Sequence, residues 1–321
     1  MNGRISKRVF IVGCPRSGTT LLQSMLASHP DVLSFPETHI LQLGIEHTGR
    51  AQIIIAPFVR VKALNSFFLE LFGRRVVHNV KDAIKIFMSA RYFVEFMILM
   101  LDKVCLENGC KVWVDKTPEH LFYISLIQDV APEAKFIHMV RDGGPVVASI
   151  VEMWDQYMFD WSSWRRSLTF LSDLYHVIRC YAKYVNGFNI ILLWKMIRYR
   201  RYIRASELWN DSFLETKKFN EQGNHYICFY EDLTLNPSDE LQKIVAFLDI
   251  QFLPAMLHPE KSAPGLIRQN EIWKNDNLAG IRQASTKKYD SLPQEIRELL
   301  EVVLVASGKE RDVIRKEEAN L

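Results

Sequence analysis

Four charged residues stand at or just beyond the ends of short apolar runs that are typical of buried strands: Arg16, Glu37, Lys116 and Arg141. The carboxyl ends of parallel strands meet at one edge of an open α/β sheet, and such proteins bind their ligands there. An arginine offers a fixed positive charge and a forked set of donors, which suits a phosphate-like anion. These positions therefore predict a site for an anionic ligand at that edge.

The segment around Arg16 has the order strand, glycine loop, helix. Val9–Val12 is a short apolar run, Gly13–Gly18 is a tight loop, and Thr19–Ser28 carries apolar residues at helical spacing. Backbone N–H groups and the positive end of a helix converge in such a loop, so that an anion can bind. The spacing nearly matches the loop of nucleotide hydrolases, but Thr19 stands where those proteins have lysine. The loop is therefore expected to bind an anion without the usual magnesium–triphosphate chemistry.

Strand and helix patterns alternate along the rest of the chain. This alternation is typical of a parallel sheet with right-handed crossovers. It predicts an α/β protein with a P-loop-like three-layer fold, in which helices flank a central parallel sheet. The further strands are expected at Val32–Phe35, Lys111–Asp115, Ala134–Val140 and His225–Phe229, and helical segments at Ile40–Glu107, Val146–Met153, Trp161–Val185, Lys195–Lys218, Asn236–Leu248 and Pro293–Ala306. We expect one domain over residues 1–321, with a helical aromatic and basic insertion at about 154–222.

The composition narrows the class of protein. Of 321 residues, 48% are hydrophobic and 24% charged, which is typical of a globular protein with a substantial core. The net charge of +3 is too small to indicate nucleic acid. The five cysteines are scattered without the spacing of a zinc site, so we expect free thiols in a reducing compartment and no metal. The N-terminus runs straight into the first strand without the apolar core of a secretion signal, and we therefore expect a cytoplasmic protein.

Three ordered motifs resemble those of sulfotransferases that use 3′-phosphoadenosine-5′-phosphosulfate (PAPS). Pro15-Arg-Ser-Gly-Thr-Thr-Leu21 resembles the family's 5′-phosphosulfate loop, and Val140–Ser149 is similar to its 3′-phosphate motif. Tyr230-Glu-Asp-Leu233 followed by Asn236-Pro237 resembles a third hallmark. The arginine in the first motif is typical of the branch that includes tyrosylprotein sulfotransferases and bacterial sulfotransferases. The resemblance extends from Phe10 to about Tyr289.

The resemblance implies that PAPS is the co-substrate and assigns residues to it. PAPS has two separated anionic ends, so its site needs two cationic cradles. The resemblance implies that the glycine loop binds the 5′-phosphosulfate and that Arg141 and Ser149 bind the 3′-phosphate. It also implies that the C-terminal segment folds back over the nucleotide. The implied binding residues are Arg16, Ser17, Gly18, Thr19, Thr20, Arg141, Ser149, Tyr230, Ser285 and Lys288.

The resemblance also implies the catalytic residues. A base must take the proton of the acceptor hydroxyl, and in the tyrosylprotein branch the corresponding residue is Glu37. His120 is the alternative, because aryl and steroid sulfotransferases use a histidine after a later strand. Arg16 is expected to stabilise the charge that grows on the bridging oxygen, and Lys116 to contact that oxygen or the sulfuryl group. A divalent metal is not obligatory for this reaction.

Two other functions stay open at this point. An ATP-dependent P-loop phosphotransferase predicts magnesium-dependent binding without preference for a 3′-phosphate, and the absent loop lysine argues against it. A non-catalytic nucleotide-binding scaffold predicts PAPS binding without turnover. The acceptor is expected to carry a hydroxyl, but the sequence does not identify it. The basic stretch at 195–204 fits an acidic acceptor, a peripheral membrane contact or a solvated helix face.

Overall fold

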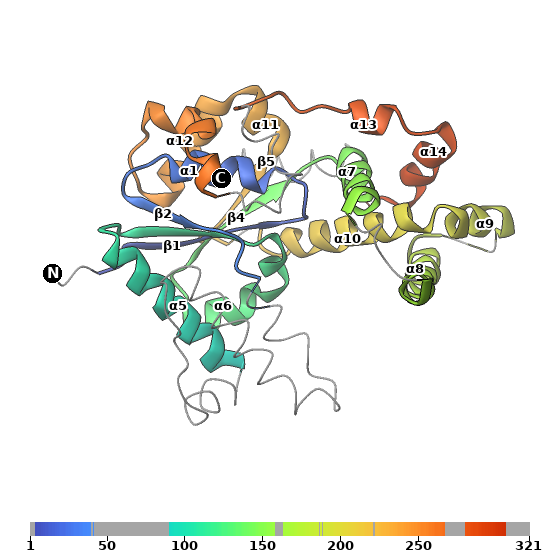
Figure 1. The fold of residues 1–321 in the computed structure, drawn as a ribbon, viewed down its shortest axis with the longest axis horizontal. Coiled ribbons are helices and arrows are strands. Elements are labelled where there is room, and N and C mark those ends of the chain that lie inside the picture. The colour runs from blue at the N-terminus through green and yellow to red at the C-terminus, as the bar shows by residue number, and fades with distance from the viewer. Residues whose placement is uncertain are drawn as a thin grey trace.

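A computed structural model describes residues 4–39, 41, 90–157, 163–185, 187, 189–220, 222–266 and 280–305. Within these residues, the chain forms a five-stranded parallel sheet in the order β2-β3-β1-β4-β5 (Figure 1). The strands are β1 (Lys7–Gly13), β2 (Val32–Phe35), β3 (Val112–Lys116), β4 (Lys135–Val140) and β5 (His225–Phe229). Helices flank this central sheet, and the predicted three-layer α/β fold is confirmed.

Strand register brings all carboxyl ends to one edge. Ile11 of β1 is level with Lys116 of β3, and Gly13 is level with Met139 of β4. On the outer pairs, Phe35 of β2 is level with Asp115, and Val140 of β4 with Phe229 of β5. Neighbouring strands lie about 4.8 Å apart. The residues that follow the five strands are therefore arranged side by side in strand order.

Helices cover both faces of the sheet and pack against it through their apolar side chains. On one face, α1 (Thr19–Ala27) and α12 (Pro237–Leu248) bury leucines and isoleucines against β1 and β4. On the other face, α5 (Ala90–Glu107) and α6 (Ile124–Val130) pack against the rings of Phe10, Trp113 and Phe136. Figure 1 shows these two layers above and below the strands.

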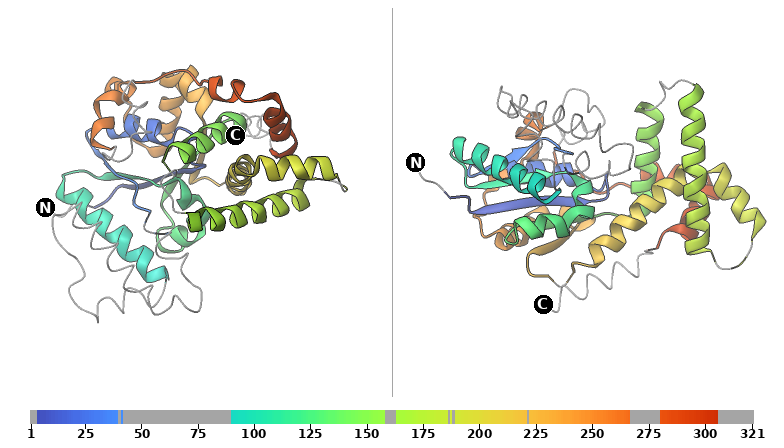
Figure 2. Two further views of the ribbon diagram at one scale, coloured as in Figure 1. Left: turned by 45° about the vertical axis from the view of Figure 1, so that its right-hand side comes forward. Right: turned by 90° about the horizontal axis from the view of Figure 1, so that it is seen from below.

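A third group of helices lies beyond the carboxyl ends of the strands. It consists of α7 (Gly143–Tyr157), α8 (Ser163–Tyr184), α9 (Ile190–Arg198), α10 (Arg200–Lys217) and α14 (Gln294–Val303). Figure 2 shows α10 running from the sheet into this group, and it packs against both α7 and α8. The helices share a core that includes Val147, Trp209 and Leu300.

The predicted helix Lys195–Lys218 is wrong in one respect, because two helices occupy this region. Helix α9 ends at Arg198, and α10 begins at Arg200 after Tyr199 has left the helical conformation. The Tyr199 hydroxyl donates a hydrogen bond of 2.8 Å to Glu295 of α14, so a tertiary contact accompanies the break. Neither glycine nor proline marks this point, and the sequence pattern therefore continued through it.

The break also changes the interpretation of the basic stretch at 195–204. Arg204 of α10 lies 3.2 Å from Asp173 of α8, and Arg200 lies 3.7 Å from the same carboxylate. Arg201 pairs with Asp155 of α7. These arginines therefore join α10 to its neighbours instead of forming one continuous basic face.

Other boundaries differ by a few residues. Helix α7 begins at Gly143, three residues before the predicted start, so the glycine pair forms its first turn. Most of the predicted helical region Ile40–Glu107 lies outside the described residues, and α5 is its described part. The remaining short helices are α11 (Tyr230–Leu235), α13 (Lys287–Asp290) and the 3-10 helices Pro118–Tyr123, Pro254–Leu257, Pro259–Lys261 and Ala263–Gly265.

Candidate functional site

The predicted site residues follow the sheet edge in strand order. Glu37 comes two residues after β2, Lys116 ends β3, and the Gly13–Gly18 loop follows β1. Arg141 follows β4, and Tyr230 follows β5. The edge therefore runs from a carboxylate and an ammonium, through an anion-binding loop, to an arginine and an aromatic ring.

The loop after β1 needs its glycines. Gly13 has a φ of +144°, and a Cβ there would lie 2.4 Å from the carbonyl oxygen of Met139. Gly18 has a φ of +90°, and a Cβ there would lie 2.2 Å from the Tyr230 ring. Arg16 also adopts a left-handed backbone, with a φ of 72°, which residues with a Cβ rarely do. The loop is therefore folded tightly against β4 and α11.

Two side chains of this loop are enclosed. Ser17 is 1% exposed, and its hydroxyl has no hydrogen-bond partner in the part of the chain that the structure describes. A buried hydroxyl without a partner is costly, so this one is available to a ligand oxygen. Burial raises the pKa of the neighbouring Cys14 thiol far above its ordinary value, which makes this cysteine a poor nucleophile. Thr19 and Thr20 are also buried, at the start of α1.

Arg141 is held by segments that are far apart in the sequence. Its Nη1 donates to the carbonyl oxygen of Arg16 at 3.4 Å, and its Nη2 to the carbonyl oxygen of Ser285 at 3.2 Å. The guanidinium carbon lies 4.5 Å from the centre of the Tyr230 ring. The indole N–H of Trp209, from α10, donates to the Arg141 carbonyl oxygen at 3.0 Å. The buried Nε of Arg141 has no partner among the described residues, so one donor is left for a ligand.

A hydrogen bond joins the glycine loop to the Val140–Ser149 motif. The Nε of Arg16 donates to the Ser149 hydroxyl at 3.0 Å. The side chains of residues 16 and 141 therefore belong to one site. We call Arg16, Arg141, Ser149, Tyr230 and Ser285 the arginine cluster.

The C-terminal segment reaches this cluster, but its two predicted residues differ in their contacts. Ser285 takes part through its backbone carbonyl, as described above. Lys288 forms an ion pair with Glu152 of α7. The Tyr289 ring packs so closely on α7 that a Cβ on Gly144 would lie 2.8 Å from it. The glycine pair at the start of α7 therefore makes room for both Tyr289 and Trp209.

At the other end of the edge, Glu37 is enclosed by two basic side chains. Lys116 is almost fully buried and contacts Glu37 Oε1. His39 lies on the other carboxylate oxygen, with 2.9 Å between its Nε2 and Glu37 Oε2. We call Glu37, His39 and Lys116 the Glu37 cluster.

The segment that carries Glu37 is tied to the end of β3. The backbone N–H of Thr38 donates to Thr117 Oγ1 at 3.0 Å, and the Thr38 hydroxyl donates to Asp115 at 3.3 Å. Asp115 also accepts a hydrogen bond of 3.3 Å from the Thr117 hydroxyl. Glu37 is therefore positioned by a buried network between β2 and β3.

His120, the alternative base, lies deeper. Its side chain is 2% exposed, its Nδ1 lies 3.0 Å from Asp115 Oδ2, and its ring packs edge-on against Phe10 at 6.1 Å. This places His120 within the core on the side of α5 and α6. Glu37 is more accessible and has Lys116 beside it.

Two residues with contacts in these clusters were not predicted. His39 is part of the Pro36–His39 segment, and its position two residues after Glu37 is a signal that could have been used. Trp209 has no such signal, because its contact with Arg141 joins residues 68 positions apart.

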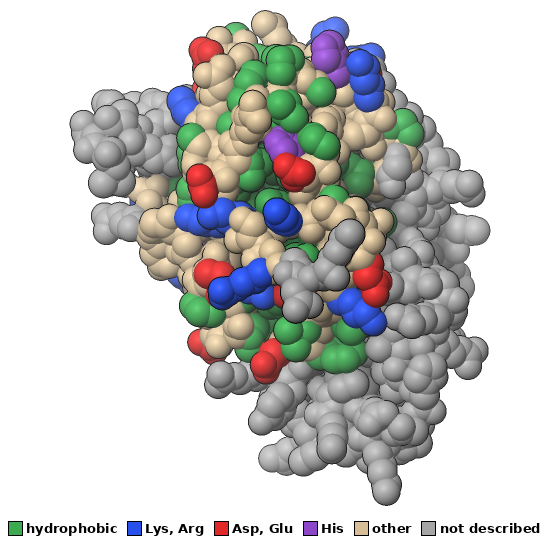
Figure 3. Space-filling view, turned by 90° about the vertical axis from the view of Figure 1, so that its left-hand side faces the viewer, with side chains coloured by type: hydrophobic (Ala, Val, Ile, Leu, Met, Phe, Trp, Pro, Cys, Tyr) green, Lys and Arg blue, Asp and Glu red, His purple; other side chains and the backbone are tan. Residues whose placement is uncertain are grey.

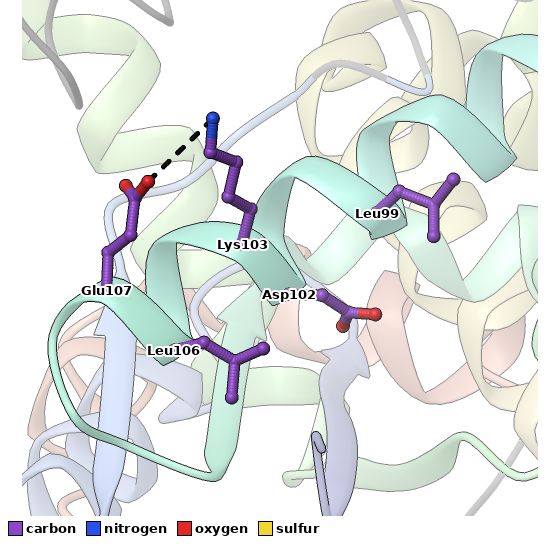
Figure 4. Close-up of a pocket in the computed structure, with 5 residues that line it drawn as sticks. All are labelled: Leu99, Asp102, Lys103, Leu106 and Glu107. Atoms are coloured by element: carbon purple, nitrogen blue, oxygen red, sulfur yellow. Dashed lines mark ion pairs between the residues drawn. The ribbon is translucent and has the colours of Figure 1, made fainter. Parts of the chain in front are cut away.

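A surface hollow of about 460 Å³ lies elsewhere, along α5 (Figure 4). It is lined by Leu99, Asp102, Lys103, Leu106 and Glu107. Asp102 accepts hydrogen bonds from Arg8, near the start of β1, and from Trp113. The hollow therefore lies toward the amino end of the sheet, away from the predicted site. Figure 3 shows the face at this end, where basic, acidic and apolar side chains are intermixed.

Comparison with known proteins identifies the family. A profile described as "Sulfotransferase family" matches residues 8–254, which is most of the chain. The chain belongs to the sulfotransferase family. Its membership agrees with the resemblance seen in the three motifs and supports the predicted PAPS-dependent reaction over the kinase alternative.

Two curated proteins illustrate the sequence similarity. A protein-tyrosine sulfotransferase from Drosophila melanogaster is 26% identical over 260 residues, covering 79% of this chain and 40% of the relative. Nodulation protein NoeE from Sinorhizobium fredii is 28% identical over 148 residues, covering 45% of this chain and 31% of the relative. The sulfotransferase chain described here thus spans less than half the length of either relative.

A solved structure supports the fold. The sulfotransferase domain of the olefin synthase from Synechococcus PCC 7002 superposes with a TM-score of 0.55 and 19% identity, covering 94% of this chain and 96% of that domain. At this level of identity the likeness shows a shared fold.

The comparison corrects the predicted location. A cytoplasmic assignment is wrong, because the similar animal proteins are protein-tyrosine sulfotransferases, which are Golgi membrane enzymes. The N-terminal residues of this chain therefore give no basis for placing it in the cytoplasm. Among the described residues, no helix is both long enough and apolar enough to cross a membrane.

Proposed function

We propose that this sulfotransferase transfers the sulfuryl group of PAPS to a hydroxyl of an organic acceptor, giving a sulfate ester. The observation that carries the proposal is the order of groups along the sheet edge. A carboxylate with a lysine follows β2 and β3, an anion-binding loop follows β1, and an arginine with a serine follows β4. From the end of β2 to the end of β4 is three strand spacings, or about 14 Å. A nucleotide with two anionic ends fits along this edge, with its reacting end toward Glu37.

The residues at the edge fit PAPS. Each anionic end meets a buried donor that lacks a partner in the described structure, the Ser17 hydroxyl in the loop and the Nε of Arg141. Ser149 completes the second cradle, and Arg16, which donates to Ser149 from the loop after β1, lies between the two ends. The Tyr230 ring lies against both Gly18 and Arg141. PAPS, when bound, supplies a sulfuryl group on a phosphate that can leave as 3′-phosphoadenosine-5′-phosphate (PAP).

The acceptor chemistry belongs to the Glu37 cluster. Glu37 takes the hydroxyl proton as the acceptor oxygen forms its bond to sulfur, and the bond between sulfur and the bridging oxygen breaks. Negative charge then grows on the bridging oxygen, where Lys116 and Arg16 are the cations that stabilise it. Glu37 is the better candidate for the base than His120, because it is more accessible and directly contacts Lys116.

The test is a pair of measurements on the purified chain. Calorimetric titration is expected to give tighter binding of PAP than of adenosine 5′-phosphate, which lacks the 3′-phosphate. Radiolabelled PAPS is then incubated with tyrosine peptides, saccharides, steroids and lipids, and transfer of label is measured for the wild type and Glu37→Gln. Equal affinity for the two nucleotides would contradict the nucleotide assignment. Binding of PAP without transfer to any acceptor would favour the scaffold alternative.

A further inference from the structure

His39 has an unusual backbone conformation. Its φ is 46°, in the left-handed region that residues with a side chain rarely occupy outside functional or strained sites. The residue lies two positions after Glu37, and this turn brings its imidazole back to the carboxylate. The network of Thr38, Thr117 and Asp115 holds the chain immediately before it. The conformation is therefore supported by buried contacts on the side of β3.

The imidazole completes a row of charged groups that runs from the interior toward solvent. The side chain of Lys116 is 2% exposed, that of Glu37 13% and that of His39 38%. Lys116 contacts Oε1 of Glu37, and His39 Nε2 lies 2.9 Å from Oε2. Because an ionised carboxylate only accepts hydrogen bonds, Nε2 must be the donor to it. Both carboxylate oxygens are thus engaged.

The second ring nitrogen, Nδ1, is the atom that takes up a proton when the histidine becomes charged. Nδ1 lies 3.8 Å from Glu119 Oε2, which comes from the 3-10 helix Pro118–Tyr123. Of the described titratable groups, Glu37 and Glu119 have carboxylate oxygens within 4 Å of the His39 ring, and Lys116 contacts the other oxygen of Glu37. Protonation of Nδ1 leaves the donation from Nε2 to Glu37 in place but adds a positive charge beside the carboxylate. That charge makes Glu37 a weaker base.

We propose that His39 is a positioning residue for Glu37, which orients the carboxylate through Nε2 and makes its strength as a base depend on the charge of the imidazole. The proposal rests on the proposed function, in which Glu37 takes the acceptor proton. Neutral His39 holds Glu37 ready to accept that proton, and charged His39 holds it in the same place with lower basicity.

The first test compares pH profiles of turnover for the wild type, His39→Gln and His39→Ala. Glutamine keeps a side-chain N–H donor but does not titrate. His39→Gln is expected to keep kcat within about threefold at the plateau and to lose the part of the acid limb that His39 causes. His39→Ala is expected to lower kcat about 10- to 100-fold with KM for PAPS unchanged. His258→Gln is the matched control, because His258 forms a similar exposed pair with Glu260 away from the site.

The second test needs no turnover. The His39 ring is titrated by NMR in the wild type and in Glu37→Gln, and removal of the neighbouring carboxylate is expected to lower the titration midpoint by about one pH unit. Unchanged midpoints would overturn the proposal, as would wild-type pH profiles in both His39 variants. The remaining outcome separates the two proposals. If the midpoint differs between the wild type and Glu37→Gln, but the wild type neither binds PAP nor uses PAPS, the coupling of His39 to Glu37 is supported and the proposed function is contradicted.

Discussion

The arginine cluster and the Glu37 cluster stand at the same sheet edge but are built differently. The arginine cluster is assembled from the connections after β1, β4 and β5 and from the segment that carries Ser285. The backbone carbonyls of Arg16 and Ser285 accept hydrogen bonds from its central guanidinium. The Glu37 cluster comes from one short segment after β2 and the end of β3, and its contacts are between charged side chains. We therefore propose the first as a cradle for an anion and the second as the chemically responsive group beside it. Binding and reaction should therefore be separable by mutation.

The largest expected effect is on the Glu37 cluster. Glu37→Gln removes the proposed base while keeping nearly the same shape, and turnover is expected to fall about 10²- to 10⁴-fold. The affinity for PAP should stay within twofold of the wild type, because the arginine cluster is untouched. Single-turnover transfer from labelled PAPS and calorimetry with PAP measure the two quantities. Glu260→Gln, at an exposed histidine–carboxylate pair, is the control, and a parallel loss of PAP affinity in Glu37→Gln would contradict the separation.

The next largest effect is a loss of nucleotide binding with little effect on the acceptor. Arg141→Ala removes charge-assisted hydrogen bonds, each of which contributes about 1.5–3 kcal/mol. PAP affinity is expected to fall about 10- to 100-fold with little change in KM for the acceptor. Calorimetry measures the loss, and Lys218→Ala, which removes an exposed cation paired with Glu215, controls for net charge. Loss of affinity in both variants would indicate a general charge effect instead of a specific cradle.

A third substitution tests how rigid the cradle is. Gly18→Ala places a methyl group 2.2 Å from the Tyr230 ring at a positive φ, whereas Gly109→Ala has a similar φ of +74° but open space. We expect Gly18→Ala to lower the free energy of unfolding by about 1–3 kcal/mol more than Gly109→Ala does, because only Gly18 adds overpacking to backbone strain. Urea denaturation measures the difference. Equal losses would show that the ring moves aside and that the cradle adapts.

The smallest expected effect is on the pH dependence of the free energy of unfolding. It defines the pH range in which the activity profiles of the His39 variants can be interpreted. His225 stacks between Phe136 and Phe219, with 2.8 Å between its Nδ1 and His138 Nε2, and burial lowers the pKa of His225 from 6.5 to about 4. Burial and the neighbouring His225 also lower the pKa of His138. Since the unfolded chain binds these protons at a higher pH than the folded chain, stability is full above about pH 6.5 and declines as pH falls toward 4.

This decline is measured by urea midpoints at pH 7 and pH 5, where a modest decrease is expected for the wild type. His225→Gln should show a smaller decrease, because it removes one of the two histidines. An unchanged pH dependence in this variant would assign the acid sensitivity to other groups. Activity profiles for His39 variants are then interpreted only where the fold is stable.

The sequence predicted the arginine cluster better than the Glu37 cluster for a physical reason. Gly13 and Gly18 are required by the backbone geometry of the loop after β1, and Arg141 directly follows β4, so that short motifs carry the signal. The strands themselves were found within a few residues, because each is a short apolar run between turn residues. The break at Tyr199, the Trp209 bond to Arg141 and the His39 contact depend on packing between distant segments. No local period encodes such contacts, and sequence reasoning missed them.

The contacts of Arg141 have a consequence for the order in which the protein becomes competent. The hydrogen bonds that join its neighbourhood span 125, 133 and 144 positions. When β5 has been translated, the chain contains all five strands of the described sheet, but Ser285 has not yet been added. Contacts between such distant positions form late, after the long loops have closed. We therefore expect full nucleotide affinity only after the segment around Ser285 has joined the sheet, so that bound PAP would report on this late contact.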